Sequence, residues 1–495
     1  MFDVIVDCYT DEPSGLGAPP YLSVHSRYLA GVLTMANREY FYLTIDDLRI
    51  LNGESILLGG TNGLNKRVIN ATKNCQNAEK LLYDASHIYI VYGCFVKYSY
   101  VSCEPPSIKE LESMVASYRD KTVLFYCLGT QDISDDLSYF LASKFSEVYY
   151  GNTYNYFIDY NHPFKANYND LAKIAPLSAS ILEQMERPVI IEIESMSGCN
   201  HKPGCTFCIE CQRNNPLDFR LEIDIIQEAV SLYSKGARYF RIGRQPNFYA
   251  YGLRHDIYRL LSGIRTKCSN IKMLHIDNVN PVDVVNDIEF NTTSAIIKYC
   301  TSGNIAPFGI ESFDKKVRED CNLNGSIEEI LNATQILNSF GAHRTTGELP
   351  CFLPGYNFIY GLDGQNENTL EYNLEYLSLV LKNDWLVRRT FVRKRTSPFG
   401  AALDKAVCSN KEYQYWCNQI EQMFSIPMLQ KIYPIGMVLQ NMRVEMVTEL
   451  GSVLRAFGTC AERILIPGKY LKLDTITDVK ITGYINHRSL QGVLQ

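Results

Sequence analysis

Three closely spaced cysteines are the residues most able to do chemistry in this sequence. Cys199, Cys205 and Cys208 lie in the segment GCNHKPGCTFC, which gives the spacing C-x5-C-x2-C. Structural zinc sites usually take four protein ligands, whereas three thiolates on one loop suit a [4Fe-4S] cluster with one iron open to an outside ligand. We therefore expect Cys199, Cys205 and Cys208 to hold an iron–sulfur cluster.

Two other interpretations of these cysteines stay open. Cys211 forms a second C-x2-C step with Cys208, which is also compatible with a zinc site in which Cys211 is the fourth ligand. In the other interpretation, the three thiols bind no metal and are scattered core residues. A fourth ligand from the protein would leave no place for an outside ligand and would make the cluster structural.

The cysteine loop follows the first of six short apolar segments that alternate with helical patterns. We predict strands at residues 189–195, 239–243, 272–277, 307–312, 357–362 and 385–392, and helices at residues 221–237, 326–342 and 367–383. Such alternation is typical of α/β folds, in which the loops after the strands carry the chemistry. Residues 188–400 are therefore expected to form a partial (β/α)6 TIM-like barrel.

Residues 1–165 show the pattern of a separate α/β domain. Apolar segments at residues 87–94, 122–129 and 147–152 are spaced like buried parallel strands, and residues 107–120 between the first two form an amphipathic helix. Ser107 and Glu110 have the spacing of a capping box at the start of that helix. We expect a doubly wound, Rossmann-like domain, in which residues 10–21 and 59–63 are Gly-rich loops that serve as turns or ligand cradles.

The C-terminal part of the chain changes character. Residues 401–432 are predicted to be a connecting helix, and residues 433–495 contain short strands separated by Gly and Pro, which indicates a small all-β barrel. Residues 431–495 contain eight basic and five acidic side chains, an excess of three positive charges, whereas the whole chain has a net charge of −6. A mildly basic barrel favours RNA binding, and a lid that packs on the rest of the chain is the alternative.

Composition and charge pattern argue against a membrane-spanning or a secreted protein. With 46% hydrophobic and 21% charged residues over 495 positions, the chain is typical of a globular protein of about three domains. No run of 18 apolar residues is present, and the first residues carry four acidic side chains and no basic segment. We expect a cytoplasmic protein without a membrane association, whose sixteen cysteines are thiols or metal ligands.

The cysteine segment and the barrel pattern together resemble the radical S-adenosylmethionine (SAM) superfamily. Its usual signature is C-x3-C-x2-C with an aromatic residue before the last cysteine, and this chain has Phe207 there but a first gap of five residues. IGRQ (residues 242–245) lies where the superfamily has a Gly-Gly-Glu-type segment for the SAM amino group, with Gln245 in place of the acid. FGIES (residues 308–312) resembles the "G-x-E-S" segment of the fourth barrel strand. The resemblance implies that SAM is bound by Gly243, Gln245, Glu311 and Ser312.

The resemblance also implies a reaction and its cofactors. SAM would bind the open iron of the cluster, and an electron from a donor of flavodoxin or ferredoxin type would cleave SAM to methionine and a 5′-deoxyadenosyl radical. That radical would remove hydrogen from an unactivated carbon. The protein supplies positioning and the exclusion of water around this chemistry.

The flanking regions resemble an archaeal branch of the superfamily, with a cobalamin-binding-like N-terminal domain and a C-terminal domain similar to the RNA-binding TRAM barrel, of OB-like type. This implies a methyltransferase, or a methylthiotransferase, that acts on a macromolecule, with RNA as the favoured substrate. Cobalamin binding and a scaffold without cofactor both stay open for the N-terminal domain. The alternatives are a cobalamin-dependent protein C-methyltransferase and a non-catalytic RNA-binding iron–sulfur protein.

Overall fold

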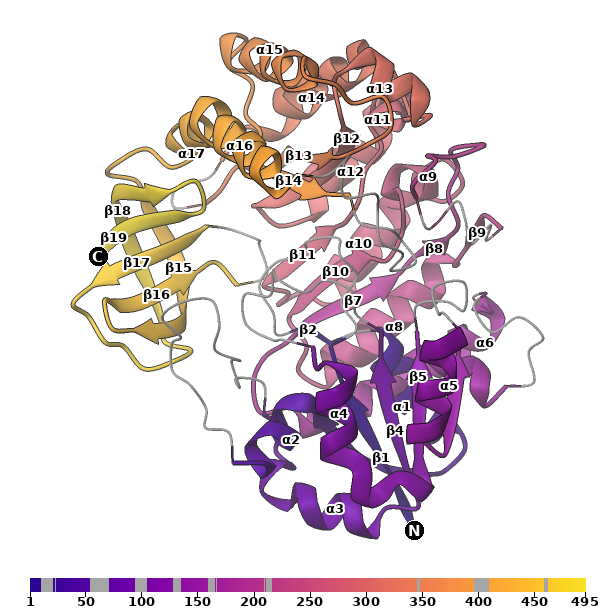
Figure 1. The fold of residues 1–495 in the computed structure, drawn as a ribbon. Coiled ribbons are helices and arrows are strands. Elements are labelled where there is room, and N and C mark those ends of the chain that lie inside the picture. Colours follow the sequence, from indigo (N-terminus) through magenta and orange to yellow (C-terminus); the bar gives the residue numbers. More distant parts are fainter. Residues whose placement is uncertain are drawn as a thin grey trace. The chain divides into compact units, whose positions relative to one another are not determined.

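The fold is taken from a computed structural model, which describes residues 1–9, 21–22, 24–53, 71–93, 105–127, 135–158, 165, 167–208, 210, 216–344, 348–395, 409–457 and 462–495. These residues divide into two compact units, and Figure 1 shows their helices and strands. The first comprises residues 1–194, 223–241 and 264–272, and the second comprises residues 195–222, 242–263 and 273–495. Within the described ranges, no helix has both the length and the apolar character needed to cross a membrane.

A five-stranded parallel sheet is the centre of the first unit. Its order is β3-β1-β4-β5-β6, and its strands are β1 (Phe2–Asp7), β3 (Glu39–Thr44), β4 (His87–Tyr92), β5 (Thr122–Tyr126) and β6 (Glu147–Tyr150). In chain order this is 2-1-3-4-5, a doubly wound topology whose strand order reverses between β1 and β4. The expected strands at residues 87–94, 122–129 and 147–152 are confirmed, with shorter ends.

The helices of the first unit alternate with these strands and bury its apolar core. They are α1 (Val24–Met35), α2 (Ile45–Leu51), α3 (Ala78–Asp84), α4 (Ile108–Val115), α5 (Asp135–Lys144) and α6 (Tyr168–Leu177), with short 3-10 helices at Cys75–Asn77, Ala116–Lys121, Thr153–Tyr156 and Ser178–Gln184. Helix α4 begins with the predicted capping box, since the Ser107 side chain accepts from the Glu110 amide and Glu110 reaches back to the Ser107 amide. A second, short parallel pair joins β2 (Tyr21–Leu22) to β7 (Ile190–Glu194), and α8 (Glu222–Ser234) follows in the chain.

Two arginines without solvent exposure hold the first unit together. Arg49 pairs with Asp46 at 2.9 Å and with Glu110 at 3.0 Å, and Arg27 pairs with Glu228 at 2.6 Å. Removing one member of such a buried pair leaves an uncompensated charge, which typically costs about 3–5 kcal/mol. The pairs with Glu110 and Glu228 connect segments that are distant in the chain, so they constrain how the helices pack.

The second unit continues the strand–helix alternation. Its strands are β8 (Met196–Ser197), β9 (Asp218–Phe219), β11 (Met273–Ile276), β12 (Asn304–Glu311), β13 (Phe352–Tyr360) and β14 (Arg389–Lys394). Its helices are α9 (Phe248–Gly252), α11 (Pro281–Val285), the 3-10 turn Ile288–Phe290, α12 (Asn291–Tyr299), α13 (Lys315–Asp320), α14 (Ile327–Gly341), α15 (Thr369–Lys382), α16 (Asn410–Ile420), a π-helical turn (Glu421–Ser425) and α17 (Ile426–Ile432). Strand β10 (Tyr239–Gly243) ends in this unit, whereas α10 (Ile257–Lys267) begins in it.

The six predicted strands of the α/β region are all present, although not in one continuous ladder. β12, β13 and β14 form a parallel sheet. β11 is joined to β12 through a side chain, because Asn304 Oδ1 accepts from the Ile276 amide at 3.2 Å. β13 begins at Phe352, five residues before the predicted start, because the backbone stays extended through Pro354 and Gly355. A mixed α/β fold is thus confirmed, while the expected domain boundaries stay predictions.

A closed five-stranded β-barrel occupies the C-terminal part of the second unit (Figure 1). Its order is β15-β16-β17-β19-β18, with β15 (Val438–Thr448), β16 (Gly451–Arg455), β17 (Arg463–Pro467), β18 (Ile476–Asn486) and β19 (Ser489–Leu494). The β17–β19 pair is parallel and the other four neighbouring pairs are antiparallel. The predicted small all-β barrel is therefore confirmed, and its TRAM- or OB-like character stays a prediction.

The barrel is fixed to the α/β part of the second unit by buried charged contacts. Arg388, which precedes β14 and is 2% exposed, pairs with Glu462 of the barrel at 2.7 Å. The Tyr433 hydroxyl donates to the same carboxylate, and Arg344 donates at 2.9 Å to the carbonyl of Ile432, which ends α17 just before the barrel. The barrel is thus packed against its neighbours rather than tethered beside them.

Candidate functional site

The three cysteines lie on the loop after β8, and each is partly exposed. Gly198 and Gly204 in this loop have φ values of 76° and 99°, a left-handed backbone that favours glycine. The His201 amide approaches Cys199 Sγ at 3.4 Å, and the Cys208 amide donates to the Cys205 carbonyl at 3.1 Å. The loop therefore brings its three thiols into one short, tightly turned segment.

The donor set fits the cofactor that the sequence predicts. Three partly exposed thiols on one loop match a [4Fe-4S] cluster in which three irons have protein ligands. No three Cys, His, Asp or Glu side chains of the described ranges are close enough together to hold one metal ion. Each iron of a cluster takes its own thiolate, so the three sulfurs need not converge on one point. The alternative fourth ligand, Cys211, lies outside the described residues.

Polar side chains from two neighbouring loops hold the first part of the cysteine loop. Asn200 donates to Asp283 Oδ2 at 2.9 Å, and Asn247 donates to the same oxygen. Asn247 in turn accepts from the Asn280 amide at 3.0 Å. Because Asn247 follows β10 and Asp283 lies on α11, the cysteine loop is joined to the segments that follow β10 and β11.

Sequence reasoning did not find this polar network. The signal was present as Asn247, Asn280 and Asp283 at segment ends, where Asn and Asp commonly cap turns and helices. Local capping gives such residues a role without any ligand, so their types alone did not mark a site. Only the fold shows that they converge on one loop.

The predicted SAM-binding residues near β10 are buried. Gln245 is 1% exposed and donates to the Ile242 carbonyl at 2.9 Å, while the Ser195 hydroxyl approaches its amide oxygen at 3.4 Å. Gly243 ends β10 and is also buried. The structure thus brings Gly243 and Gln245 to the base of the cysteine loop, and their part in SAM binding stays a prediction.

Glu311 and Ser312, at the end of β12, have different surroundings. Ser312 is 1% exposed, and its hydroxyl accepts from the Asp314 amide at 3.0 Å. Glu311 is partly exposed and has a left-handed φ of 60° at a β-bulge. Non-glycine residues in this conformation are strained, and such strain concentrates at functional sites. Of the two, Glu311 is the side chain available to a ligand.

The electrostatics of Glu311 also set it apart. Burial raises the pKa of its carboxyl to about 7, and the positive charges of Arg393 and Arg318 oppose this rise. Gly309 makes room for the carboxylate, since a Cβ on Gly309 would lie 2.8 Å from Glu311 Oε1. Near neutral pH, Glu311 can therefore either donate or accept a hydrogen bond, as a general acid–base group or a ligand hydroxyl contact requires.

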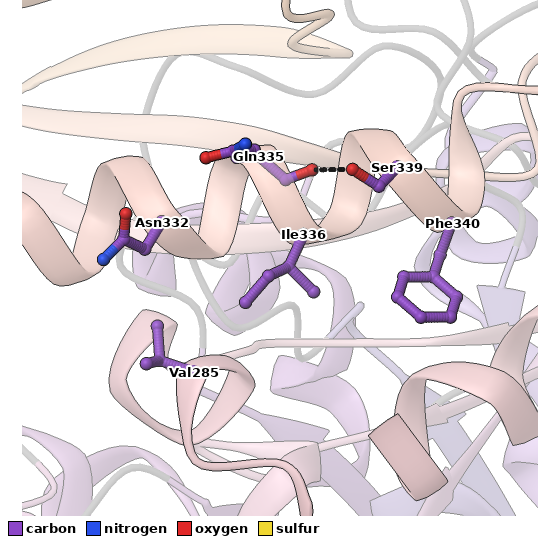
Figure 2. A pocket seen from close by; sticks show the side chains of 6 residues that line it. All are labelled: Val285, Asn332, Gln335, Ile336, Ser339 and Phe340. Carbon is purple, nitrogen blue, oxygen red and sulfur yellow. Dashed lines mark hydrogen bonds between the residues drawn. The ribbon is translucent and has the colours of Figure 1, made fainter. Parts of the chain in front are cut away.

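A separate surface hollow of about 430 Å³ lies between α11 and α14. Figure 2 shows Ile336 and Phe340 of α14 on the side that faces Val285 of α11. The lining residues are Val285, Asn332, Gln335, Ile336, Ser339 and Phe340. None of the predicted site residues lines this hollow, so it is not part of the candidate site.

Comparison with known proteins places the chain in a family. No family model matches it. An uncharacterized protein from Methanocaldococcus jannaschii is 32% identical over 533 residues, which cover 99% of this chain and 92% of that protein. The chain belongs to the family of this archaeal protein. Another relative, an uncharacterized protein from Archaeoglobus fulgidus, is 31% identical over 100% of this chain and 90% of its own length.

Solved structures show which fold the family has. The cobalamin-dependent SAM radical enzyme OxsB, with aqua-cobalamin and SAM bound, aligns with a TM-score of 0.51 and 10% identity over 84% of this chain. Apo, selenomethionine-labelled OxsB gives a TM-score of 0.51 and 12% identity. The chain spans about half of OxsB, 55% of its length. The structural neighbours of the family are thus radical SAM enzymes, and the likeness is one of fold.

Proposed function

We propose that this protein is a radical SAM enzyme in which Cys199, Cys205 and Cys208 hold a [4Fe-4S] cluster. The observation that carries the proposal is a three-cysteine loop on a chain with the fold of OxsB. When bound, the cluster and SAM supply reductive cleavage of SAM and hydrogen abstraction from an unactivated carbon. Three protein thiolates leave one iron for the amino and carboxylate groups of SAM.

The residues of the chain would bind and orient SAM at the end of β12. Among the described residues, no side chain hydrogen-bonds the Glu311 carboxylate, and this leaves it available to a ligand hydroxyl. Gly309 keeps the strand surface beside Glu311 open. Gly243, Gln245 and Ser312, which are buried, would shape the backbone around SAM rather than contact it through their side chains.

Methyl transfer is the reaction that we propose, with cobalamin as a second cofactor. OxsB is a cobalamin-dependent enzyme. The first unit of this chain has a doubly wound sheet, and such sheets bind ligands beyond the carboxyl ends of the strands where their order reverses. Those ends belong to β1 and β4. The Gly-rich segments at residues 10–21 and 59–63, which the sequence offered as cradles, lie outside the described residues except for Tyr21.

We keep RNA as the proposed substrate. The excess of basic residues in the barrel sequence favours RNA, but ion pairs seen in the structure weaken that argument. Several of the cationic side chains have acidic partners: Arg443 pairs with Asp474, Arg455 with Glu445 at 3.0 Å, and Lys431 with Asp384. Paired cations are less available to phosphates. A protein substrate is the alternative, and salt-dependent binding of RNA to the full chain separates the two.

Anaerobic reconstitution tests the proposed function. We expect the wild-type protein to bind about four irons and four sulfides, and to form 5′-deoxyadenosine from SAM when reduced. The variant with Cys199, Cys205 and Cys208 all changed to Ala should do neither. Wild-type protein that binds zinc but no iron would refute the proposal. Added hydroxocobalamin and cobalt analysis test the second cofactor.

A structural cluster with four protein ligands is the second candidate, and one observation favours testing it. Cys321 is fully buried and packs in the same apolar group as Cys205. Its thiol faces the Asp363 carbonyl at 3.6 Å. If the fourth iron is open, Cys321→Ala and Cys211→Ala should both keep the cluster. If either variant binds one iron fewer than wild type, or if removing the cysteine ends its competition with SAM for the fourth iron, the structural cluster is favoured.

A further inference from the structure

The turn after α13 lies directly against the cysteine loop. Asn322 Nδ2 donates to the Gly204 carbonyl at 2.8 Å, and His201 Nε2 donates to the Asn322 carbonyl at 2.8 Å. Two residues after Gly204, the Thr206 amide donates to the Cys321 carbonyl at 3.1 Å. The loop is therefore hydrogen-bonded, from His201 to Thr206, to a single turn.

Apolar contacts reinforce the same junction. Cys205 and Phe207 pack against a small group of buried side chains from α13, the turn after it and the end of β13, namely Val317, Cys321, Leu323 and Leu362. This apolar group therefore packs over the buried side of Cys205. The loop thus has both a polar and an apolar face fixed by the segment after β12.

Arg318 ties this turn to the end of β12. Its guanidinium donates to the Ile310 and Ser312 carbonyls at 3.0 and 2.8 Å, and to the Asn324 and Gly325 carbonyls at 2.8 and 2.6 Å. A guanidinium is a planar fork, so four carbonyls around it are held in a fixed arrangement. The two carbonyls on the strand side flank Glu311.

Arg318 also lies within electrostatic reach of both halves of the site. Burial lowers the pKa of its guanidinium, and the negative charges of Cys205 and Glu311 act against that change. Arginine keeps its charge in proteins. Arg318 is therefore a permanent cation between the cysteine loop and the strand end that bears Glu311.

We infer that Asn322 and Arg318 are positioning residues that fix the cysteine loop relative to Glu311. This inference rests on the proposed function and deepens it, because SAM must reach the cluster and the end of β12 at the same time. Neither residue is assigned a contact with SAM or iron. They act through the Gly204 carbonyl on one side and the Ile310 and Ser312 carbonyls on the other.

The backbone of Asn322 allows its two roles to be separated. Its φ is 48°, a left-handed conformation that Asn, Asp and Gly tolerate better than other residues. Asn322→Asp keeps the shape but replaces the amide donor with an oxygen that faces the Gly204 carbonyl. Asn322→Gly keeps the backbone and removes the side chain. Asn37, exposed and with a φ of 53°, provides the matched control Asn37→Asp.

The experiment measures cluster content and the response of the cluster to SAM. Each variant is reconstituted anaerobically and reduced, its iron is quantified, and its electron paramagnetic resonance spectrum is titrated with SAM. We expect Asn322→Asp and Arg318→Lys to need about 10–100-fold more SAM than wild type for the SAM-dependent spectral change, the range found when residues behind metal ligands are altered. Asn37→Asp should match wild type.

The outcomes separate this inference from the proposed function. If wild type binds iron and responds to SAM, and Asn322→Asp and Arg318→Lys respond at the same SAM concentration, the inference is wrong and the proposed function stands. If wild type binds no cluster, the proposed function itself fails. Should Asn322→Asp not fold, Asn322→Gly replaces it, and an unchanged SAM response in Asn322→Gly and Arg318→Lys overturns the inference.

Discussion

Asp7 and Glu311 are both carboxylates at the ends of parallel strands, and their surroundings differ. Asp7, the last residue of β1 in the first unit, is 2% exposed and accepts hydrogen bonds from Ser26 Oγ at 2.6 Å, Tyr42 OH at 3.0 Å and the Tyr9 amide at 2.8 Å. Glu311, the last residue of β12 in the second unit, is partly exposed on a strained backbone. Burial raises the pKa of both carboxyls.

This contrast shows why a place at a strand end does not by itself identify a functional carboxylate. The donors around Asp7 already belong to the fold, so its polar capacity is used in stabilising the first unit. Glu311 has charged neighbours but no hydrogen-bonded partner among the described residues. Glu311 is the candidate ligand contact because its carboxylate is available for a hydrogen bond. Its location at a strand end and its raised pKa do not distinguish it from Asp7.

The largest expected effect concerns the buried charges of the first unit. Arg49→Met should lower the free energy of unfolding by about 3–5 kcal/mol, because the Asp46 carboxylate would stay buried without its cation. Lys316→Ala, which breaks an exposed pair with Asp320, should have a much smaller effect, because solvent screens exposed charges. Urea unfolding of both variants and wild type measures this. Equal effects of the two substitutions would contradict the difference assigned to buried and exposed ion pairs.

A smaller effect should separate Glu311 from ordinary surface carboxylates. Its folded pKa of about 7 lies above the unfolded value, so the folded state binds the proton more tightly. This contribution to stability is complete below the unfolded pKa and is lost as the pH rises through about 7. Relative to Glu311→Gln, wild type should lose about 1–2 kcal/mol between pH 5 and 8, an amount reduced for partial exposure.

Urea unfolding of the metal-free proteins at the two pH values measures this difference. Glu348→Gln, at an exposed carboxylate of the same unit, is the control and should show no comparable change. If the free energies of unfolding of wild type and Glu311→Gln change in parallel between pH 5 and 8, the pKa of Glu311 is not raised by the fold.

The smallest effect should come from the exposed thiol of the cysteine loop. Cys199 is partly exposed, so Cys199→Ala should change the stability of the metal-free protein by less than about 0.5 kcal/mol. Cys321→Ala removes a fully buried sulfur and should cost about 1–2 kcal/mol through the space it leaves. Thermal unfolding without iron compares them. A larger cost for Cys199→Ala would assign that thiol to the core.

Much of the secondary structure could be predicted from the sequence because local chemistry determined it. The capping box at Ser107 and Glu110 is a short-range signal and was predicted correctly. Gly236, with a φ of 100°, follows α8 as a helix-ending glycine does. The strands of the α/β region followed from their apolar character, and the closed C-terminal barrel from its short, Gly-punctuated segments.

Other features depend on tertiary contacts that the sequence does not display. Gly341 is the last residue of α14, and a Cβ there would clash with the Phe352 carbonyl, so a glycine is needed for the close packing of α14 on β13. The cysteine loop was recognised from its spacing. Asn322 and Arg318, which lie more than a hundred residues further along the chain, had no signal to connect them with it.

The pairing of Arg388 with Glu462 has a consequence for how the molecule can come apart. If the barrel left its place, the almost wholly buried Arg388 guanidinium would lose the carboxylate of Glu462, which precedes β17, and Tyr433 would lose its acceptor. The barrel and the sheet formed by β12, β13 and β14 should therefore unfold in one cooperative transition. A chain cut near residue 432 would lose both the Glu462 carboxylate and Tyr433, so we expect the truncation to destabilise the strands that pack on the barrel.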